Sequence, residues 1–216
     1  SDGTSPSREA ARRAYRETVP HYPMSAGEGN HAIYHTFDVG RCRFIVTDTR
    51  SERTPYTIAD NPTKTVLGTQ QKAWFKAQLL AASADPSIAA TFWVNTFPWT
   101  GTGSPGAAPP RENWAAYPTE RAEIATFIKT NGIEGVFLLS GDMHASALDD
   151  GRTYDFAVDG TNPYPGGQFA HGLPVFQAGP LYQTASSKGT PYMIGPMIVS
   201  GVRDQFGIVT VTDSGS

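Results

Sequence analysis

Residues 135–144 read Gly-Val-Phe-Leu-Leu-Ser-Gly-Asp-Met-His, an uninterrupted apolar run that is followed at once by polar residues. A short apolar run of this kind is typical of a strand that is buried on both faces of a sheet. In open α/β sheets functional groups gather beyond the carboxyl ends of the strands, and Asp142 and His144 stand at that place. The run therefore predicts an α/β protein with a site at the end of this strand.

Asp142 and His144 combine two residue types that bind metal ions. In an extended turn, residues two apart point the same way, so a carboxylate and an imidazole can reach one ion or two adjacent ones. We take both as candidate metal ligands and catalytic residues, with Gly141 allowing the backbone to turn sharply. The alternative is a turn aspartate and a surface histidine. Ser140 is not expected to act as a nucleophile with His144, because the sequence has no Gly-x-Ser-x-Gly elbow.

Outward from this segment, strand and helix patterns alternate along the chain. The expected strands are residues 33–39, 42–48, 90–95 and 135–139, and the expected helices begin near Ser7, Thr69 and Pro118, with Ser7 and Thr69 as caps. Gly40 joins the first two strands, which predicts a hairpin. Alternation of this kind predicts layers of helix on sheet.

The carboxyl-terminal third of the chain has a different character. Residues 149–204 show little periodicity and many Gly, Pro and Tyr, so they are expected to be loops, as are residues 98–110. Residues 206–212 alternate like a final strand. Trp114, next to the Gly/Pro-rich loop, is the tryptophan expected to line a cleft.

Composition excludes several classes of protein. The chain has 216 residues, 39% of them hydrophobic, which favours one domain (1–216) with a real core. A net charge of −3 shows no excess of basic residues of the kind that binds nucleic acid. Cys42 is the only cysteine, so neither an intrachain disulfide nor a thiolate zinc site can form. No apolar run reaches the roughly 20 residues of a membrane span. Because the chain begins without Met, we expect a processed or clipped chain.

Two arginines follow the second expected strand. Arg50 and Arg53 come just after Asp48. Guanidinium groups match phosphate oxygens in a bidentate way, so both are candidate substrate-binding residues. The alternative is a pair of loop arginines that bridge to acidic residues. Asp48 itself is expected to hold Arg50 or backbone amides in place.

Five stretches, in order, resemble the PhoD-like branch of the calcineurin-type metallophosphoesterases. Residues 44–50 with Arg53 are similar to a strand that ends in Asp-Thr-Arg, and residues 67–75 with Leu79 to a Leu-Gly-x-x-Gln-x-x-Trp-Leu helix. Residues 112–117 with Arg121 are similar to an acidic-x-Trp-Asp-Gly-Tyr segment, residues 139–144 to a Ser-Gly-Asp-x-His metal loop, and residues 206–209 to a late strand. Two departures bear on substrate preference: Ala115-Ala116 replaces Asp-Gly, and residues 95–98 read Asn-Thr-Phe-Pro where related enzymes often place a His ligand.

The resemblance implies a layered, αββα-type metallophosphoesterase core that is incomplete here, this chain being its carboxyl-terminal part. Family members supply earlier metal ligands from an amino-terminal half that ends in a Trp-Asp-Asp-His type segment, which this sequence lacks. The missing half is therefore an expected partner. The resemblance also implies export from the cytoplasm, as a secreted, periplasmic or cell-surface protein.

The leading hypothesis is hydrolysis of phosphate mono- or diesters, of the alkaline phosphatase or phosphodiesterase type, at a site with two or more metal ions. Asp142 and His144 would be ligands, and Fe, Ca, Zn and Mn remain open. The second hypothesis is a non-catalytic half-domain that is inactive alone or pairs with its missing half. A third is a loop-rich ligand-binding module with an aromatic surface.

Overall fold

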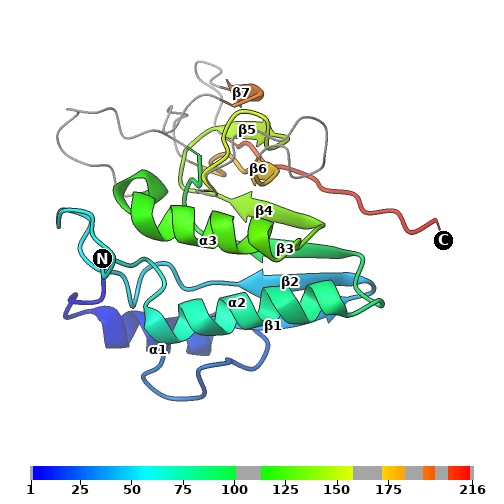
Figure 1. Ribbon diagram of the computed structural model, residues 1–216. Helices are drawn as coiled ribbons and strands as arrows, with labels where there is room; N and C mark the ends of the chain where they lie inside the picture. The colour runs from blue at the N-terminus through cyan, green and yellow to red at the C-terminus, as the bar shows by residue number, and fades with distance from the viewer. Residues whose placement is uncertain (1, 101–112, 158–171, 183–191, 198–203, 215–216) are drawn as a thin grey trace.

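One mixed sheet of seven strands organises the part of the chain that the structure describes (Figure 1). The structure is a computed structural model, which describes residues 2–100, 113–157, 172–182, 192–197 and 204–214. The strands are β1 (His35–Val39), β2 (Cys42–Val46), β3 (Ala90–Val94), β4 (Val136–Ser140), β5 (Ser146–Asp149), β6 (Val175–Gln177) and β7 (Ile194–Met197). The helices are α1 (Arg8–Thr18), α2 (Thr69–Ala84), the 3-10 turn η1 (Trp114–Ala116) and α3 (Pro118–Thr130). The α/β class predicted from the sequence is confirmed.

Parallel pairing dominates the centre of the sheet. Its order is β1-β2-β3-β4-β6-β5-β7. Strands β2, β3, β4 and β6 run parallel, while β1 pairs antiparallel with β2, and β5 pairs antiparallel with β6 and β7. The loops that follow the four parallel strands therefore leave from the same edge of the sheet.

The predicted hairpin between β1 and β2 is present. Val39 is the register partner of Cys42, so the two strands are joined by a two-residue turn. Gly40 in this turn has a φ of 57°, a left-handed conformation that glycine adopts without steric cost. The sequence signal and the turn geometry agree here.

One face of the sheet packs against α2 and α3 (Figure 1). Ile45, Trp93, Leu138 and Val175 are register partners from β2 to β6 and are at most 1% exposed. The ring of Phe75 on α2 lies 4.6 Å from that of Trp93. This row and the apolar faces of the two helices form the core, in which burial removes apolar surface from water.

The opposite face carries a row of phenylalanines, which we call the aromatic ladder: Phe37, Phe44, Phe92, Phe137 and Phe176. The first four are register partners across β1 to β4. Consecutive rings along the ladder are 5.0, 5.1, 5.6 and 6.2 Å apart. All but Phe92 are only partly buried. The sequence predicted that β4 is buried on both faces, but among the described residues it is fully buried on the helix side alone.

The carboxyl-terminal third differs from the prediction in two ways. Residues 149–204 were expected to be loops, yet β6 and β7 lie within them. Residues 206–212 were expected to form a strand, yet they carry no strand and stay largely exposed. Alternating apolar residues predict a strand only where a neighbouring strand has a free edge to pair with, and that depends on distant parts of the chain. Residues 158–171 and 183–191 of the expected loops lie outside the described residues.

Two local expectations are also corrected. Thr69 does not cap α2, because it is the first helical residue and Gly68, with a φ of 75°, is the N-cap. Ser7 is the N-cap of α1 but makes no side-chain capping bond. Pro118 does begin α3, as the sequence predicted, and Asn131 is the residue that caps its carboxyl end.

Trp114 lies in the core, and the expectation that it lines a cleft is wrong. It is 0% exposed and packs edge-on against Trp99 at 5.1 Å and Trp93 at 5.8 Å. Its indole Nε1 donates to the side-chain oxygen of Asn95 at 3.1 Å. Most of the Gly/Pro-rich loop, residues 101–112, lies outside the described residues.

Glu120 anchors the first turn of α3 to the segment that precedes α2. Its carboxylate is 1% exposed and accepts bonds from the hydroxyl of Thr65 (2.5 Å) and the amide of Val66. The Nζ of Lys72 lies 3.6 Å away. Burial raises the pKa of Glu120, and these donors oppose that effect.

Replacement of Glu120 by alanine is expected to lower the free energy of unfolding by about 2 kcal/mol, because the buried amide of Val66 loses its acceptor. Glu123 provides a matched control, since it lies on the same helix, pairs with Lys72 and Lys76 at 2.7 Å and is 39% exposed. Glu123→Ala should cost roughly 0–1 kcal/mol. Urea unfolding of both variants measures the difference, and equal losses would contradict the anchoring role.

Candidate active site

The loops after β2, β3, β4 and β6 begin at the same height at the carboxyl edge of the sheet. Backbone hydrogen bonds continue the pairing one residue past each strand: Thr47 N to Val94 O (3.1 Å), Asn95 N to Leu139 O (2.9 Å) and Ala178 N to Ser140 O (2.8 Å). The strands thus fix where each loop starts. Side chains that open these loops are brought to one edge.

The loop after β4 holds Asp142 and His144 in an unusual backbone conformation. Their φ angles are 67° and 60°, in the left-handed region that residues other than glycine seldom adopt. Met143 and Ala145 alternate with them and are 0% exposed, so they fix the loop to the core. Asp142 and His144 are left at least partly exposed. Strained residues of this kind cluster at functional sites.

The sequence predicted that Gly141 makes the sharp turn, and this prediction is wrong. Gly141 has no left-handed φ, and a β-carbon built on it would come no closer than 3.9 Å to the carbonyl oxygen of Thr96. The left-handed residues are Asp142 and His144 themselves. Aspartate tolerates this region better than most side chains, which is a physical reason for its presence there.

Gln177 at the end of β6 clamps the start of this loop. Its Nε2 donates to the carbonyl of Gly141 at 2.7 Å, and its Oε1 accepts from the hydroxyl of Ser140 at 2.6 Å. The side chain is 3% exposed. Sequence reasoning missed Gln177, because it lies in a region expected to be loop and only the pairing of β4 with β6 reveals it.

Asp48 orders the loop after β2. One carboxylate oxygen accepts from the amides of Arg50 (3.0 Å) and Ser51 (2.9 Å). The other accepts from the amide of Ile33 (3.1 Å) and the hydroxyl of Ser51. Asp48 is 5% exposed. The expectation that it holds backbone amides in place is confirmed.

Of the two candidate arginines, Arg50 is the one with an ion-pair contact to the β4 loop among the described residues. An Nη2 of Arg50 lies 3.9 Å from a carboxylate oxygen of Asp142, and both side chains are 35% exposed. Arg53 is 1% exposed, with its guanidinium 5.7 Å from the centre of the Phe97 ring. The edge of the site that is open to solvent is therefore formed by Arg50, Asp142 and His144.

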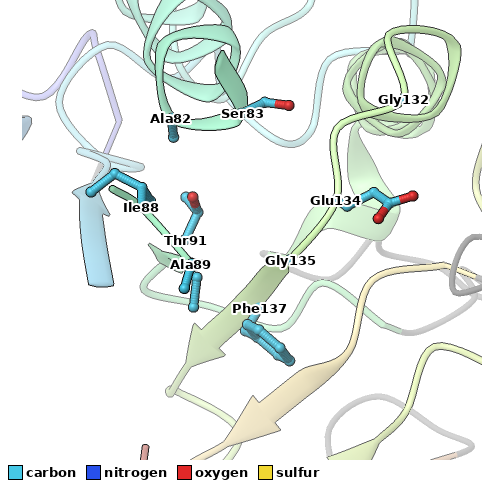
Figure 2. Close-up of a pocket in the computed structure, with 10 residues that line it drawn as sticks. Ala82, Ser83, Ile88, Ala89, Thr91, Gly132, Glu134, Gly135 and Phe137 are labelled. Atoms are coloured by element: carbon cyan, nitrogen blue, oxygen red, sulfur yellow. The ribbon is translucent and has the colours of Figure 1, made fainter. Parts of the chain in front are cut away.

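The opposite edge of the sheet has a cavity of a different kind. It measures about 480 Å³ and lies between the end of α2 and the starts of β3 and β4 (Figure 2). Glu134 is the one ionisable residue among the described residues that line it. We place the candidate chemistry at the carboxyl edge for this reason.

The sequence model of the PhoD-like phosphatase family matches residues 2–174. This chain belongs to that family. Alkaline phosphatase D of Bacillus subtilis (strain 168) is 30% identical over 153 residues, which are 64% of this chain and 26% of that protein. A solved structure described as "Structure of PhoD" has a TM-score of 0.59 at 23% identity and covers 80% of this chain and 33% of its own. The chain thus spans about a quarter to a third of the length of these relatives.

Within the described residues of this PhoD-like chain, no group of three or more His, Cys, Asp and Glu side chains is arranged to hold a metal ion. Asp142 and His144 nevertheless offer one oxygen and one nitrogen donor on a single loop whose start is bonded to Gln177. This donor pair fits a divalent or trivalent ion as part of a larger ligand set. In the same described part of the chain, no helix is long and apolar enough to cross a membrane.

Gln177→Leu is expected to loosen the β4 loop, because two hydrogen bonds of about 1 kcal/mol each are lost at a buried position. The backbone amides of residues 141–145 should then exchange with deuterium roughly tenfold faster or more. Hydrogen exchange followed by peptide mass spectrometry measures this. Phe176→Leu is the control, because Phe176 is the next residue along but belongs to the aromatic ladder on the opposite face. It should leave the exchange of this loop unchanged. Equal exchange in both variants would rule out the clamp.

Proposed function

We propose that the protein carrying this chain hydrolyses phosphate mono- or diesters at a metal site to which Asp142 and His144 contribute two ligands. The observation that carries the proposal is the β4 loop, which holds both residues at left-handed φ angles with Arg50 alongside. Strain of about 1–3 kcal/mol per residue is kept only where the surroundings enforce it. Here the buried Met143 and Ala145 and the Gln177 clamp enforce it.

Each side chain at this edge has a distinct role in the proposal. Asp142 is an oxygen ligand and His144 a neutral nitrogen ligand. Arg50, with its backbone fixed by Asp48, binds phosphoryl oxygens through its guanidinium fork. A bound ion would supply positive charge that stabilises the negative charge developing on the phosphoryl group. Oxygen and nitrogen donors of this kind suit Fe, Ca, Zn or Mn, and the two or more ions of this proposal need further ligands from the rest of the protein.

Arg53 is left out of the substrate contacts in this proposal. Its burial and its position beside Phe97 suit a residue that shapes the loop from below. Arg50 and Arg53 both lie near the Phe97 ring, Arg50 at 6.0 Å from its centre. The same ring is thus near a partly exposed arginine and a buried one.

His144→Ala in the complete protein should lower both metal content and turnover, the latter by more than about 100-fold, since loss of even an outer-shell partner costs about 10- to 100-fold. Metal analysis by mass spectrometry and hydrolysis of p-nitrophenyl phosphate are measured on the same sample. His31→Ala is the control, because His31 is exposed and far from the β4 loop in sequence. His171 is not used as the control, because it lies outside the described residues. Full metal content with near-normal turnover in His144→Ala would sink the assignment.

We also propose that a second sheet, from another part of the same protein, packs on the aromatic ladder and completes an αββα-type core. The ladder presents a flat apolar face with no described helix on it, and two sheets pack face to face by interdigitating such side chains. The apolar run of β4 is itself typical of a strand buried on both faces. The relatives are three to four times longer than the part that this chain matches, which leaves ample chain for the second sheet.

The chain alone is expected to show negligible phosphatase activity, and addition of the remaining part of the protein should restore it. Phe44→Lys should weaken this restoration by about tenfold or more, because it places a charge in the sheet-to-sheet interface. Leu80→Lys is the control, since Leu80 is 43% exposed on α2. Robust hydrolysis of p-nitrophenyl phosphate by the verified single chain, or equal restoration by both variants, would contradict this proposal.

The second candidate is a half-domain with no catalytic role, and it predicts no activity even when the remaining part is added. The ion pair distance between Arg50 and Asp142 favours the catalytic alternative, because it places a phosphate-binding group beside a candidate ligand. Export from the cytoplasm is part of the same proposal and rests on the family.

A further inference from the structure

A cavity of about 250 Å³ lies between α1 and the loops that follow β2 and β3. Ala11, Arg12 and Tyr15 of α1 line one side of it, and Arg50 and Thr96 line the other. Arg50 thus borders the cavity and also lies 3.9 Å from Asp142. A group bound in the cavity would sit next to the candidate site.

The walls of this cavity combine apolar surface with charged side chains. Ala11, Ile33 and the ring of Tyr15 supply the apolar part. Arg12 is 4% exposed, and its two Nη atoms bond to Asn30 and Glu52. These bonds hold the Arg12 side chain in place as part of the cavity wall.

The size of the cavity limits what it can hold. Pockets for drug-sized ligands run from about 300 to 1,000 Å³, so this one suits a single substituted ring. Tyr15 offers a ring face for stacking. Burial raises the pKa of Tyr15, so its phenol stays neutral and able to donate at mildly alkaline pH.

We propose that this cavity binds the alcohol part of the phosphate ester, and that it selects an alcohol that bears a ring. The proposal rests on the proposed function. In the reaction, water adds to phosphorus, the bond from phosphorus to the alcohol oxygen breaks, and the alcohol leaves with a proton from the water. The alcohol departs from between α1 and Arg50.

Ala11→Leu tests the proposal by filling the cavity from a helix position whose side chain is exposed enough to leave the fold intact. Ala14→Leu is the matched control, because Ala14 is exposed on the same helix and does not line the cavity. The two substrates are 4-methoxybenzyl phosphate and ethyl phosphate, assayed with the complete, metal-loaded protein. Ala11→Leu should raise KM for the ring-bearing ester by about tenfold, as loss of about 1.4 kcal/mol of binding would, and leave that for ethyl phosphate unchanged.

The opposite results would overturn the proposal. An unchanged KM for 4-methoxybenzyl phosphate in Ala11→Leu, or an equal rise for both esters, rules out selection by the cavity. Failure of the wild-type protein to hydrolyse either ester counts against the proposed function instead. In that case calorimetric titration with 4-methoxybenzyl alcohol decides: binding to wild type and Ala14→Leu but about tenfold weaker binding to Ala11→Leu supports the cavity, and equal binding or none refutes it.

Discussion

Parallel pairing of β2, β3 and β4 in a single register sets the positions of nearly everything else in this molecule. Phe44, Phe92 and Phe137 are register partners, and so are Ile45, Trp93 and Leu138, one residue further along each strand. Neighbouring residues of a strand point to opposite faces, so the aromatic ladder and the helix-facing core are two consequences of one register. A slip of one residue in any strand would exchange the two faces. The same register aligns the loops that carry Asp48, Asn95 and Asp142.

The left-handed residues of the β4 loop depend on that alignment. The left-handed backbone of Asp142 and His144 costs free energy. The buried Met143 between them and the Gln177 clamp hold it in place. Gln177 can act in this way because β6 lies beside β4 in the sheet, although Gln177 follows Ser140 by 37 positions in the sequence. The geometry of the candidate ligands is thus a property of the sheet more than of the loop's own sequence.

The sequence reached the parts of this structure that are set by local patterns. The hairpin at Gly40, the start of α3 at Pro118 and the position of Asp142 after a buried strand all follow from neighbouring residues. The wrong or missing predictions concern long-range packing. The role of Gln177 depends on the pairing of β6 with β4, and the burial of Trp114 depends on two tryptophans that are distant in sequence. The burial of Arg53 likewise depends on contacts that its neighbours in the sequence do not reveal. Residues 206–212 alternate as a strand does, but no described strand pairs with them. Asp142 and His144 as metal ligands stay a prediction from sequence. The conformation of the β4 loop supports it, and the metal analysis of His144→Ala will test it.

The three core tryptophans have an optical consequence. Trp93, Trp99 and Trp114 lie 5.1 to 5.8 Å apart, with ring planes crossing at 66° to 75°. Indole transitions this close and this strongly crossed couple to one another, which gives a paired positive and negative band in far-ultraviolet circular dichroism. Excitation energy absorbed by one ring is shared among all three, so their emission reports on a single spot in the core. The core therefore carries its own spectroscopic signal, which vanishes when the rings separate and leaves the surface loops unobserved.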